Sequence, residues 1–284
     1  MNKIAFIGAG HMAAALIGGL RAHGVAPKQI VVSARTPGKL AALQAQFGVD
    51  TTTDNEHAVK GADVVLLAMK PQDLPDAAAK MALAIQASHP LVVSVAAGVR
   101  IVTIEAALQG YAHIVRAMPN RPALIAKGVT ALFAAPAVSR PQRDDVQQLF
   151  MTAGEVAWLE REELMDAATA VSGSGPAYFF LLTELLEEAA IALGLPAPVA
   201  RSLSVQTAYG AGCMARELCA TGAATPQEST PEQLRKAVTS PGGTTAAALA
   251  VLEKADLRGI VHRAVAAAAQ RATELAAATP RFAR

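Results

Sequence analysis

The first 24 residues constrain the fold more than any other part of the chain. The apolar run "KIAFI" leads into the glycine-rich turn "GAGHMA", and an alanine- and leucine-rich segment follows it. Gly8, Gly10 and Ala13 thus form the pattern G-x-G-x-x-A between a strand and a helix. There the first glycine permits a tight turn, the second lets backbone approach a pyrophosphate, and the small third residue allows close helix–strand packing. The segment predicts a dinucleotide-binding unit; the alternative is a tight turn without a ligand.

The same alternation of strand and helix continues to about residue 160. Continuous apolar strands separated by helices are typical of a parallel sheet that helices cover on both faces. We therefore predict an α/β fold with a Rossmann-type, doubly wound parallel sheet. Further strands are predicted over 29–35, 62–71, 90–98, 113–120 and 128–135, and helices over 11–24, 37–48 and 140–154.

From Glu162 onward the chain shows almost no strand signal. The helices predicted there span 162–172, 176–193, 197–220, 231–238, 243–254 and 256–278. A chain of 284 residues is long enough for two ordinary domains. We predict a dinucleotide-binding domain at 1–161 and an all-α domain at 162–284.

The helix predicted over 176–193 is apolar on more than one face in its first half, "PAYFFLL". Such a helix must be buried on several sides. Apolar residues make up 52% of the chain and charged residues only 17%, which also indicates surface hidden by association. We expect a homo-oligomer; the alternative is a central helix of a monomeric bundle. The net charge of +2 gives no electrostatic footprint for nucleic acid.

Neither a membrane nor a metal is expected as a partner. Lys3 and the apolar run after it look like the start of a signal peptide, but His11 interrupts the run and the two glycines break it as a helix. No stretch of 18 residues reads as a membrane span. The two cysteines are not spaced as a CxxC pair, and the six histidines are scattered. We expect a cytoplasmic protein with reduced cysteines and no metal site.

The end of the second predicted strand bears on the choice of dinucleotide. A ribose 2′-hydroxyl usually attracts an Asp or Glu about 20 residues after the glycines. Here the stretch from Ser33 to Pro37 has no acid and offers hydroxyls and the cation of Arg35, with Lys39 close behind. A 2′-phosphate fits such a stretch better, so we expect NADP(H), with NAD(H) as the alternative. Otherwise the two cations are simply the solvated start of a helix.

Three other predicted strands end on the carboxyl edge of the sheet, where ligands bind in such folds. Lys70 in "LAMKPQ" either contacts phosphate or caps this edge. The small residues Ala96, Ala97 and Gly98 leave room for a flat nicotinamide ring against the backbone. The third of these strands ends in "RAMPN".

The start of the helical region bears on the reaction. A ketone or alcohol substrate needs a strong proton donor such as Lys or His. In hydroxyacid dehydrogenases of this architecture a lysine lies on the helix after a glycine-rich segment, and the corresponding stretch here, "SGSGPAYFFLLTELLEEAA", contains neither residue type. An iminium already carries its proton, so hydroxyls and backbone amides suffice to position it. The stretch therefore favours an imine over a hydroxy acid as substrate.

Several motifs together resemble one family. "SGSGPAYFFLL" and "LRKAVTSPGGTTAAALAVLE", with "IGAGHM", "LAMKPQ", "SVAAGV" and "RAMPNRPA", are similar to Δ1-pyrroline-5-carboxylate reductases, in order from Lys3 to about Glu274. The resemblance implies reduction of 1-pyrroline-5-carboxylate to L-proline with NAD(P)H, the last step of proline synthesis. It also implies that the helical domain binds substrate and dimerises, and that dimers commonly form a decamer. The implied active site lies between the nucleotide domain of one subunit and helical elements from both.

The resemblance also assigns residues. Thr245 matches the family's proposed proton donor or hydrogen-bond partner to the ring nitrogen, and Ser240 is the second catalytic candidate. Implied substrate contacts are Met118, Pro119, Asn120, Glu228, Gly242, Gly243 and Thr244. Implied cofactor contacts are Gly8, Ala9, Gly10, His11, Met12, Ala13, Ser33, Arg35, Asn55, Ala68, Met69, Lys70, Pro71, Ala96, Ala97 and Gly98. For Ser240 and Thr244 the alternative is ordinary helix N-capping.

Other functions stay open on the sequence. One is a related imine reductase or a β-hydroxyacid dehydrogenase, which turnover of a 3-hydroxy acid would reveal. The other is a non-catalytic NADP-binding sensor, which would bind the dinucleotide without turnover.

Overall fold

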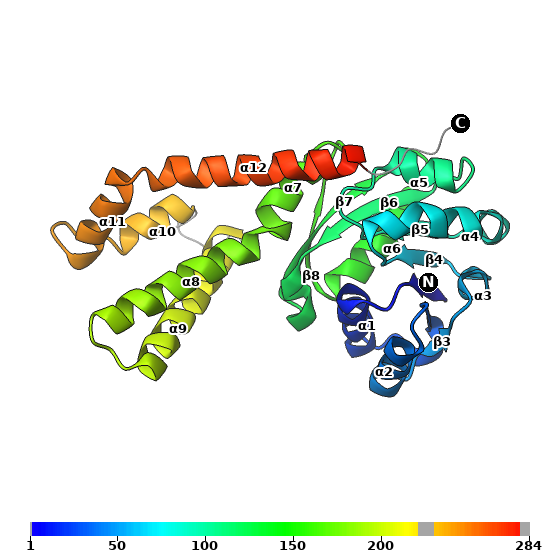
Figure 1. Cartoon of the computed structure of the whole chain (residues 1–284), viewed down its shortest axis with the longest axis horizontal. Coiled ribbons are helices and arrows are strands. Elements are labelled where there is room, and N and C mark those ends of the chain that lie inside the picture. The colour runs from blue at the N-terminus through cyan, green and yellow to red at the C-terminus, as the bar shows by residue number, and fades with distance from the viewer. Residues whose placement is uncertain (1, 221–229, 279–284) are drawn as a thin grey trace. The chain divides into compact units, whose positions relative to one another are not determined.

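The computed structural model describes residues 2–220 and 230–278. The chain divides into two compact units, whose elements are labelled in Figure 1. The first unit contains the residues up to Pro176 together with those from Ala266 on, and the second unit contains Ala177–Val265. The first unit is therefore made from two separate stretches of the chain.

The first unit is built on one eight-stranded sheet with the order β3-β2-β1-β4-β5-β6-β7-β8. The strands are β1 (Ile4–Ile7), β2 (Ile30–Ser33), β3 (Asp50–Thr52), β4 (Val64–Leu67), β5 (Leu91–Ser94), β6 (Ile114–Pro119), β7 (Gly128–Ala134) and β8 (Gly154–Trp158). Every neighbouring pair is parallel except β6 and β7, which are antiparallel. The Rossmann-type doubly wound fold is confirmed, but the expectation of a wholly parallel sheet is wrong at β7.

The reversal at β7 follows from the length of the connection before it. Between Pro119 at the end of β6 and Gly128 at the start of β7 lies only the short 3₁₀ turn η3 (Arg121–Ile125). A parallel neighbour needs a crossover connection of about a dozen residues or more. β7 therefore returns beside β6 in the opposite direction. β8 runs parallel to β7 after the crossover helix α6 (Arg140–Met151).

The apolar pattern of the sequence does not reveal two of the strands. β3 is "DTT", without an apolar side chain, and β8 is "GEVAW", in which half-buried and exposed residues alternate. Both lie at the edges of the sheet. Edge strands lack the covering that makes central strands continuously apolar. The central strands β1, β2, β4 and β5 are instead buried at every position.

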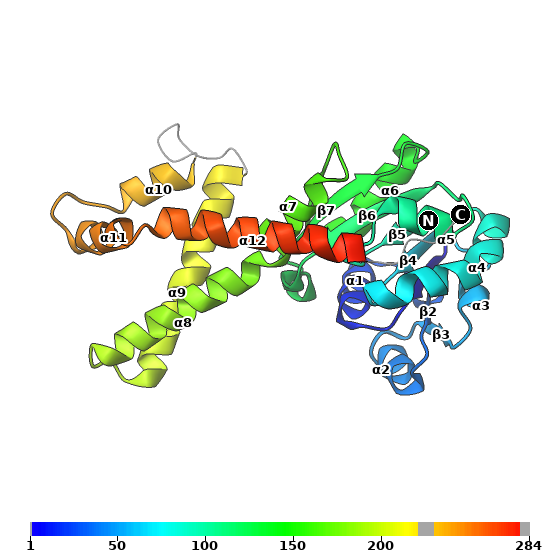
Figure 2. The same ribbon diagram turned by 45° about the horizontal axis from the view of Figure 1, so that its top comes forward.

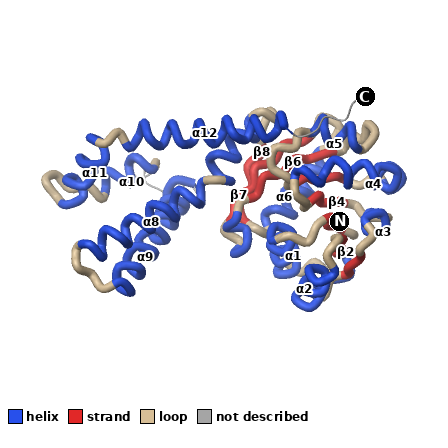
Figure 3. Tube along the Cα trace, in the orientation of Figure 1, coloured by secondary structure: helices blue, strands red, loops and turns tan. Residues whose placement is uncertain are grey.

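Helices lie on both faces of this sheet, as the blue helices around the red strands in Figure 3 show. Those of the first unit are α1 (His11–Ala22), α2 (Pro37–Phe47), α3 (Asn55–Val59), α4 (Leu74–Ser88), α5 (Ile101–Ala107), α6 and α7 (Leu164–Ala168), with the 3₁₀ turns η1 (Pro27–Gln29), η2 (Pro71–Asp73) and η3 and the π-helical turn η4 (Thr169–Gly173). Side chains such as Phe6, Leu16 and Met81 are fully buried between these layers. Their removal from water is the main contribution that stabilises the unit.

The second unit is helical, as the sequence predicts. It contains most of α8 (Gly175–Ala192), all of α9 (Ala197–Ala215), the π-helical turn η5 (Arg216–Ala220), α10 (Pro231–Ala237), α11 (Thr244–Lys254) and the first part of α12 (Leu257–Ala278). Helices α8 and α9 lie side by side in Figures 1 and 2, and Arg201 Nε donates to Glu187 Oε1 between them (3.0 Å). Among the described residues, no helix combines the length and the apolar character that crossing a membrane requires.

Candidate functional site

The turn after β1 holds the carboxyl ends of three neighbouring strands together. Gly8 has a φ of +117°, a conformation that strains any residue with a side chain. Its N–H donates to the carbonyl oxygen of Ser33 at the end of β2 (2.7 Å). A Cβ atom on Gly8 would lie 2.3 Å from the carbonyl oxygen of Ala68, just after β4. Only glycine fits between these two strand ends.

The next glycine leaves space at the start of a helix. Gly10 is the N-cap of α1 with an ordinary φ of −88°, and no side chain caps the helix. A Cβ atom on Gly10 would meet nothing within 4 Å. The first backbone hydrogen bond of α1 runs from Ala14 N–H to Gly10 O (3.0 Å), so the N–H groups of His11 to Ala13 have no intrahelical partner. An uncapped helix start beside an open space suits a phosphate.

The polar residues after β2 lie on the same edge. The buried Ser33 donates through Oγ to Asn55 Oδ1 at the start of α3 (2.6 Å), so these two predicted cofactor residues are neighbours. Arg35 is highly exposed and forms an ion pair with Asp73 of η2, with 3.0 Å between Nη2 and Oδ2. Asp73 follows β4, on the far side of β1, and is 38 residues away from Arg35 in the chain. The sequence next to Arg35 therefore shows no acid. Sequence reasoning missed this carboxylate for that reason.

The segments after β4 and β5 complete this edge. Ala68 and Met69 are half-buried and Lys70 is exposed. Gly98, after β5, has a φ of +74°, and a Cβ atom on it would lie 3.3 Å from the backbone nitrogen of Ala276. The C-terminal part of α12, which belongs to the same unit, therefore packs closely on this turn. The structure brings the predicted cofactor residues to the carboxyl ends of β1, β2, β3, β4 and β5.

Asn120, directly after β6, has a polar side chain that forms hydrogen bonds within the protein. Asn120 is buried; its Nδ2 donates to Ser172 O (3.0 Å), and its Oδ1 accepts from the N–H of Val129 (3.0 Å). The side chain thus ties β7 and the π-helical turn η4 to the end of β6. In this turn a Cβ atom on Gly173 would lie 2.8 Å from Met118 Cε. Sequence reasoning assigned Asn120 to substrate contact and did not detect this positioning role.

Two largely buried ion pairs support the same region. Arg116 of β6 pairs with Glu162 (2.8 Å), and the same carboxylate oxygen accepts the N–H of Ile101 at the start of α5 (2.8 Å). Asp166 of α7 pairs with Arg100 (3.1 Å) and accepts from Thr273 Oγ1 of α12 (2.9 Å). These contacts join β6, α5, α7 and the C-terminal part of α12. No local sequence signal announces them, because the partners are far apart in the chain.

The turn before α11 belongs to the second unit. Gly242 adopts a φ of +69°, and the Gly243 N–H donates to Ser240 O (3.1 Å). Gly243 is the N-cap of α11 and no side-chain hydrogen bond caps the helix, so the capping alternative for Ser240 and Thr244 is not supported. The N–H groups in the first turn of α11 therefore lack intrahelical partners. Thr245 belongs to this turn, and its side chain is half-buried. Glu228 lies outside the described residues.

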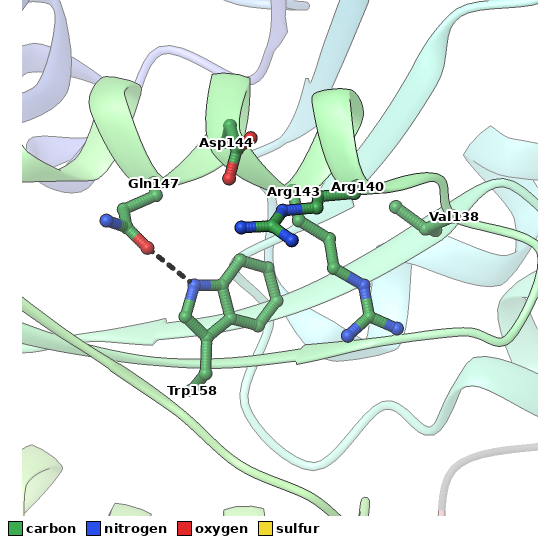
Figure 4. A pocket seen from close by; sticks show the side chains of 6 residues that line it. All are labelled: Val138, Arg140, Arg143, Asp144, Gln147 and Trp158. Atoms are coloured by element: carbon green, nitrogen blue, oxygen red, sulfur yellow. Dashed lines mark hydrogen bonds between the residues drawn. The ribbon is translucent and has the colours of Figure 1, made fainter.

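A separate pocket lies beside β8, the last strand of the sheet. It is lined by Val138, Arg140, Arg143, Asp144, Gln147 and Trp158 (Figure 4). Trp158 Nε1 donates to Gln147 Oε1 (2.9 Å), and the Arg143 guanidinium carbon is 5.8 Å from the ring centroid of Trp158. None of these lining residues belongs to the glycine-rich turn, and Trp158 lies on β8, the last strand of the sheet, which β4, β5, β6 and β7 separate from β1. The pocket is therefore distinct from the glycine-rich turn.

The part of the chain that the structure describes contains no candidate metal site. Within residues 2–220 and 230–278, no group of three or more His, Cys, Asp or Glu side chains is arranged to hold a metal ion.

Comparison with known proteins gives a consistent result. Residues 162–275 match the family model described as pyrroline-5-carboxylate reductase dimerisation, and residues 3–98 match NADP oxidoreductase coenzyme F420-dependent. The chain is 43% identical to pyrroline-5-carboxylate reductase of Pseudomonas aeruginosa, covering 96% of this chain and 97% of that protein. It is 38% identical to the reductase of Corynebacterium melassecola, with 97% and 99% covered.

Solved structures agree with these sequence matches. The pyrroline-5-carboxylate reductase of Coxiella burnetii superposes with a TM-score of 0.89 at 41% identity, covering 96% of this chain and 98% of that one. The pyrroline carboxylate reductase of Plasmodium falciparum, solved with NADP bound, superposes with a TM-score of 0.82 at 26% identity, with the same coverage. The resemblance carried by the sequence motifs is thereby confirmed. The chain belongs to the pyrroline-5-carboxylate reductase family.

Proposed function

We propose that this chain reduces 1-pyrroline-5-carboxylate to L-proline with NAD(P)H, the last step of proline synthesis. The observation that carries the proposal is the uncapped start of α11 behind the Ser240–Thr245 turn, in a chain of this family. The relatives do not favour a β-hydroxyacid dehydrogenase or a non-catalytic sensor. The absence of Lys and His from 172–190 agrees with an imine as the reacting group.

The Ser240–Thr245 turn is suited to hold the substrate carboxylate. The backbone N–H groups at the start of α11 have no intrahelical partner, and the positive end of the helix dipole favours an anion there. Gly243 keeps this turn tight, because a Cβ atom on it would lie 2.5 Å from Ser240 Oγ. The Ser240 hydroxyl is exposed and free to reach the same carboxylate.

Thr245 is the residue we assign to the imine nitrogen. Its hydroxyl, in the first turn of α11, would donate to or accept from the ring nitrogen and so fix the orientation of the imine. When bound, the dinucleotide supplies the hydride that adds to the imine carbon. The contribution of the protein is then orientation and electrostatic stabilisation rather than covalent chemistry.

The dinucleotide half of the site fits NADP(H). The open space beside Gly10 and the uncapped start of α1 suit the pyrophosphate, and Arg35 offers a cation for a 2′-phosphate. The relative from Plasmodium falciparum is solved with NADP bound. NADP(H) is the proposed cofactor, and NAD(H) remains a weaker alternative.

The proposed assembly is a homodimer formed by the helical domain 162–284, with five dimers completing a decamer. The family match to dimerisation begins at residue 162, which supports a functional boundary between residues 161 and 162. Large apolar side chains of α8 are exposed in the single chain, including Phe179 (70%) and Phe180 (64%). A partner subunit would remove this surface from water. A cytoplasmic location is part of the proposal.

The purified protein is expected to oxidise NADPH only when 1-pyrroline-5-carboxylate is present, with proline as the product. The loss of NADPH absorbance and amino-acid analysis of the product measure this directly. A 3-hydroxy acid with NADP⁺ serves as the control and is expected to give no reduction. Tight NADPH binding without any turnover of the imine would contradict the proposed reaction and favour the sensor.

Gly10→Ala is expected to weaken NADPH binding about tenfold or more, because its methyl group fills the space that the pyrophosphate needs. The thermal midpoint is expected to stay close to that of the parent protein, since φ is ordinary and no atom lies nearby. Calorimetric titration with NADPH measures the affinity. Gly110→Ala is the matched control: its φ of +89° predicts a loss of stability without a loss of binding. Parent-like NADPH affinity of Gly10→Ala would refute the assignment.

A further inference from the structure

A charged pair spans the glycine-rich turn. β1 lies between β2 and β4 in the sheet, and its end is bonded to both neighbours, with Gly8 N–H on Ser33 O (2.7 Å) and Ala68 N–H on Ile7 O (2.8 Å). Arg35 follows β2 and Asp73 follows β4, yet their side chains meet at 3.0 Å. The pair therefore closes across the end of β1, over the turn to which the dinucleotide is assigned.

The two partners are unequally exposed. The Arg35 side chain is 87% exposed and that of Asp73 is 38% exposed, so the pair lies in water and exchanges partners easily. A 2′-phosphate is a stronger acceptor for a guanidinium than a carboxylate is, because it carries more charge. Before Arg35 binds such a phosphate, its bond to Asp73 must be broken or shared.

We propose that Asp73 is a specificity-determining residue that limits, through Arg35, the preference of this chain for NADPH over NADH. The inference rests on the proposed dinucleotide site. A cofactor with a 2′-phosphate must compete with the Asp73 carboxylate for Arg35. A cofactor with a free 2′-hydroxyl leaves the pair intact. Asp73 therefore weakens the binding of one cofactor and not of the other.

Asp73→Asn is expected to tighten NADPH binding roughly two- to five-fold at low salt, the range that a solvent-exposed ion pair spans. NADH affinity is expected to stay unchanged. The dissociation constants of NADPH, NADP⁺ and NADH are measured by fluorescence and calorimetric titration, without the imine substrate. The gain is expected to shrink at high salt, because screening weakens both the pair and its competitor.

Two further variants separate this role from general electrostatics. Asp76→Asn removes the same charge from an exposed side chain in the first turn of α4 and is expected to leave the NADPH to NADH ratio unchanged. In an Arg35→Gln background, Asp73→Asn is expected to lose its effect, because Asp73 acts through Arg35. A gain that persists in that background, or an equal gain with Asp76→Asn, overturns the inference.

The outcome is distinguishable from failure of the proposed reaction. Binding is measured without turnover, so a selective gain in NADPH affinity supports the role of Asp73 even if no imine is reduced. Unchanged NADPH affinity in Asp73→Asn overturns the inference even if the enzyme reduces 1-pyrroline-5-carboxylate at full rate. Thermal midpoints of all variants verify that the folded protein is compared throughout.

Discussion

Replacing Thr245 with valine is expected to lower kcat/KM for 1-pyrroline-5-carboxylate by about 100-fold, the loss typical of one preorganised donor at a reacting centre. Valine keeps the shape of threonine and removes only the hydroxyl. No hydrogen bond ties the Thr245 side chain to other residues in the described parts of the chain, and it does not cap α11. The thermal midpoint and the NADPH affinity are therefore expected to stay at the parent values while the rate falls.

The neighbouring threonine provides the control for this variant. Thr244→Val makes the same chemical change one position earlier, on an exposed side chain. Thr244 is an implied substrate contact but is not assigned to the ring nitrogen, so this variant is expected to lose much less activity than Thr245→Val. Thr245→Ser keeps the hydroxyl and should recover much of the lost rate. Steady-state kinetics with varied imine at saturating NADPH measure all three variants. Full activity of Thr245→Val would refute the role of the hydroxyl while leaving the membership of the family intact.

Glu162→Leu is expected to destabilise the first unit by about 3–5 kcal/mol, because it leaves the buried guanidinium of Arg116 without its partner. The side chain of Arg116 is only 4% exposed, so water does not replace the lost carboxylate. The N–H of Ile101 loses its acceptor at the same time. Trp158, the single tryptophan, belongs to the same unit and reports urea unfolding by its fluorescence.

Two comparisons test the physical reason. Glu163→Leu alters the adjacent, exposed glutamate and is expected to shift stability by no more than about 0.5 kcal/mol. The double variant Arg116→Met, Glu162→Leu removes both charges and should recover a large part of the loss, as for other buried pairs. A double variant no more stable than the single one would show that packing, and not the unpaired charge, causes the loss.

Much of the fold was predictable because burial leaves a continuous apolar pattern. The central strands and the helices of the second unit are predicted in this way, and the spacing of Gly8 and Gly10 predicts the tight turn between β1 and α1. The two edge strands are missed because they lack such burial. The direction of β7 is missed because it depends on the length of the connection before it, and not on its own residues.

In the candidate site too, local features were predictable from the sequence and contacts between distant residues were not. The glycines are recognisable because the tight turn that requires them is formed by residues adjacent in the sequence. The pairing of Arg35 with Asp73 spans 38 residues, that of Arg116 with Glu162 spans 46, and the bond from Asn120 to Ser172 spans 52. No window of sequence contains both members of such a pair. The contacts of Asp73, Glu162 and Asn120 therefore emerge only once the chain is folded.

The return of α12 to the first unit affects the order in which the protein is completed. On the ribosome, all eight strands emerge before the helices of the second unit are made. Asp166 must nevertheless wait for Thr273, 107 residues later, and the turn at Gly98 is uncovered until Ala276 has been synthesised. The first unit thus reaches its final packing only after the whole of Ala177–Val265, the second unit, has been synthesised. The unit whose synthesis begins first is therefore the last to complete its packing.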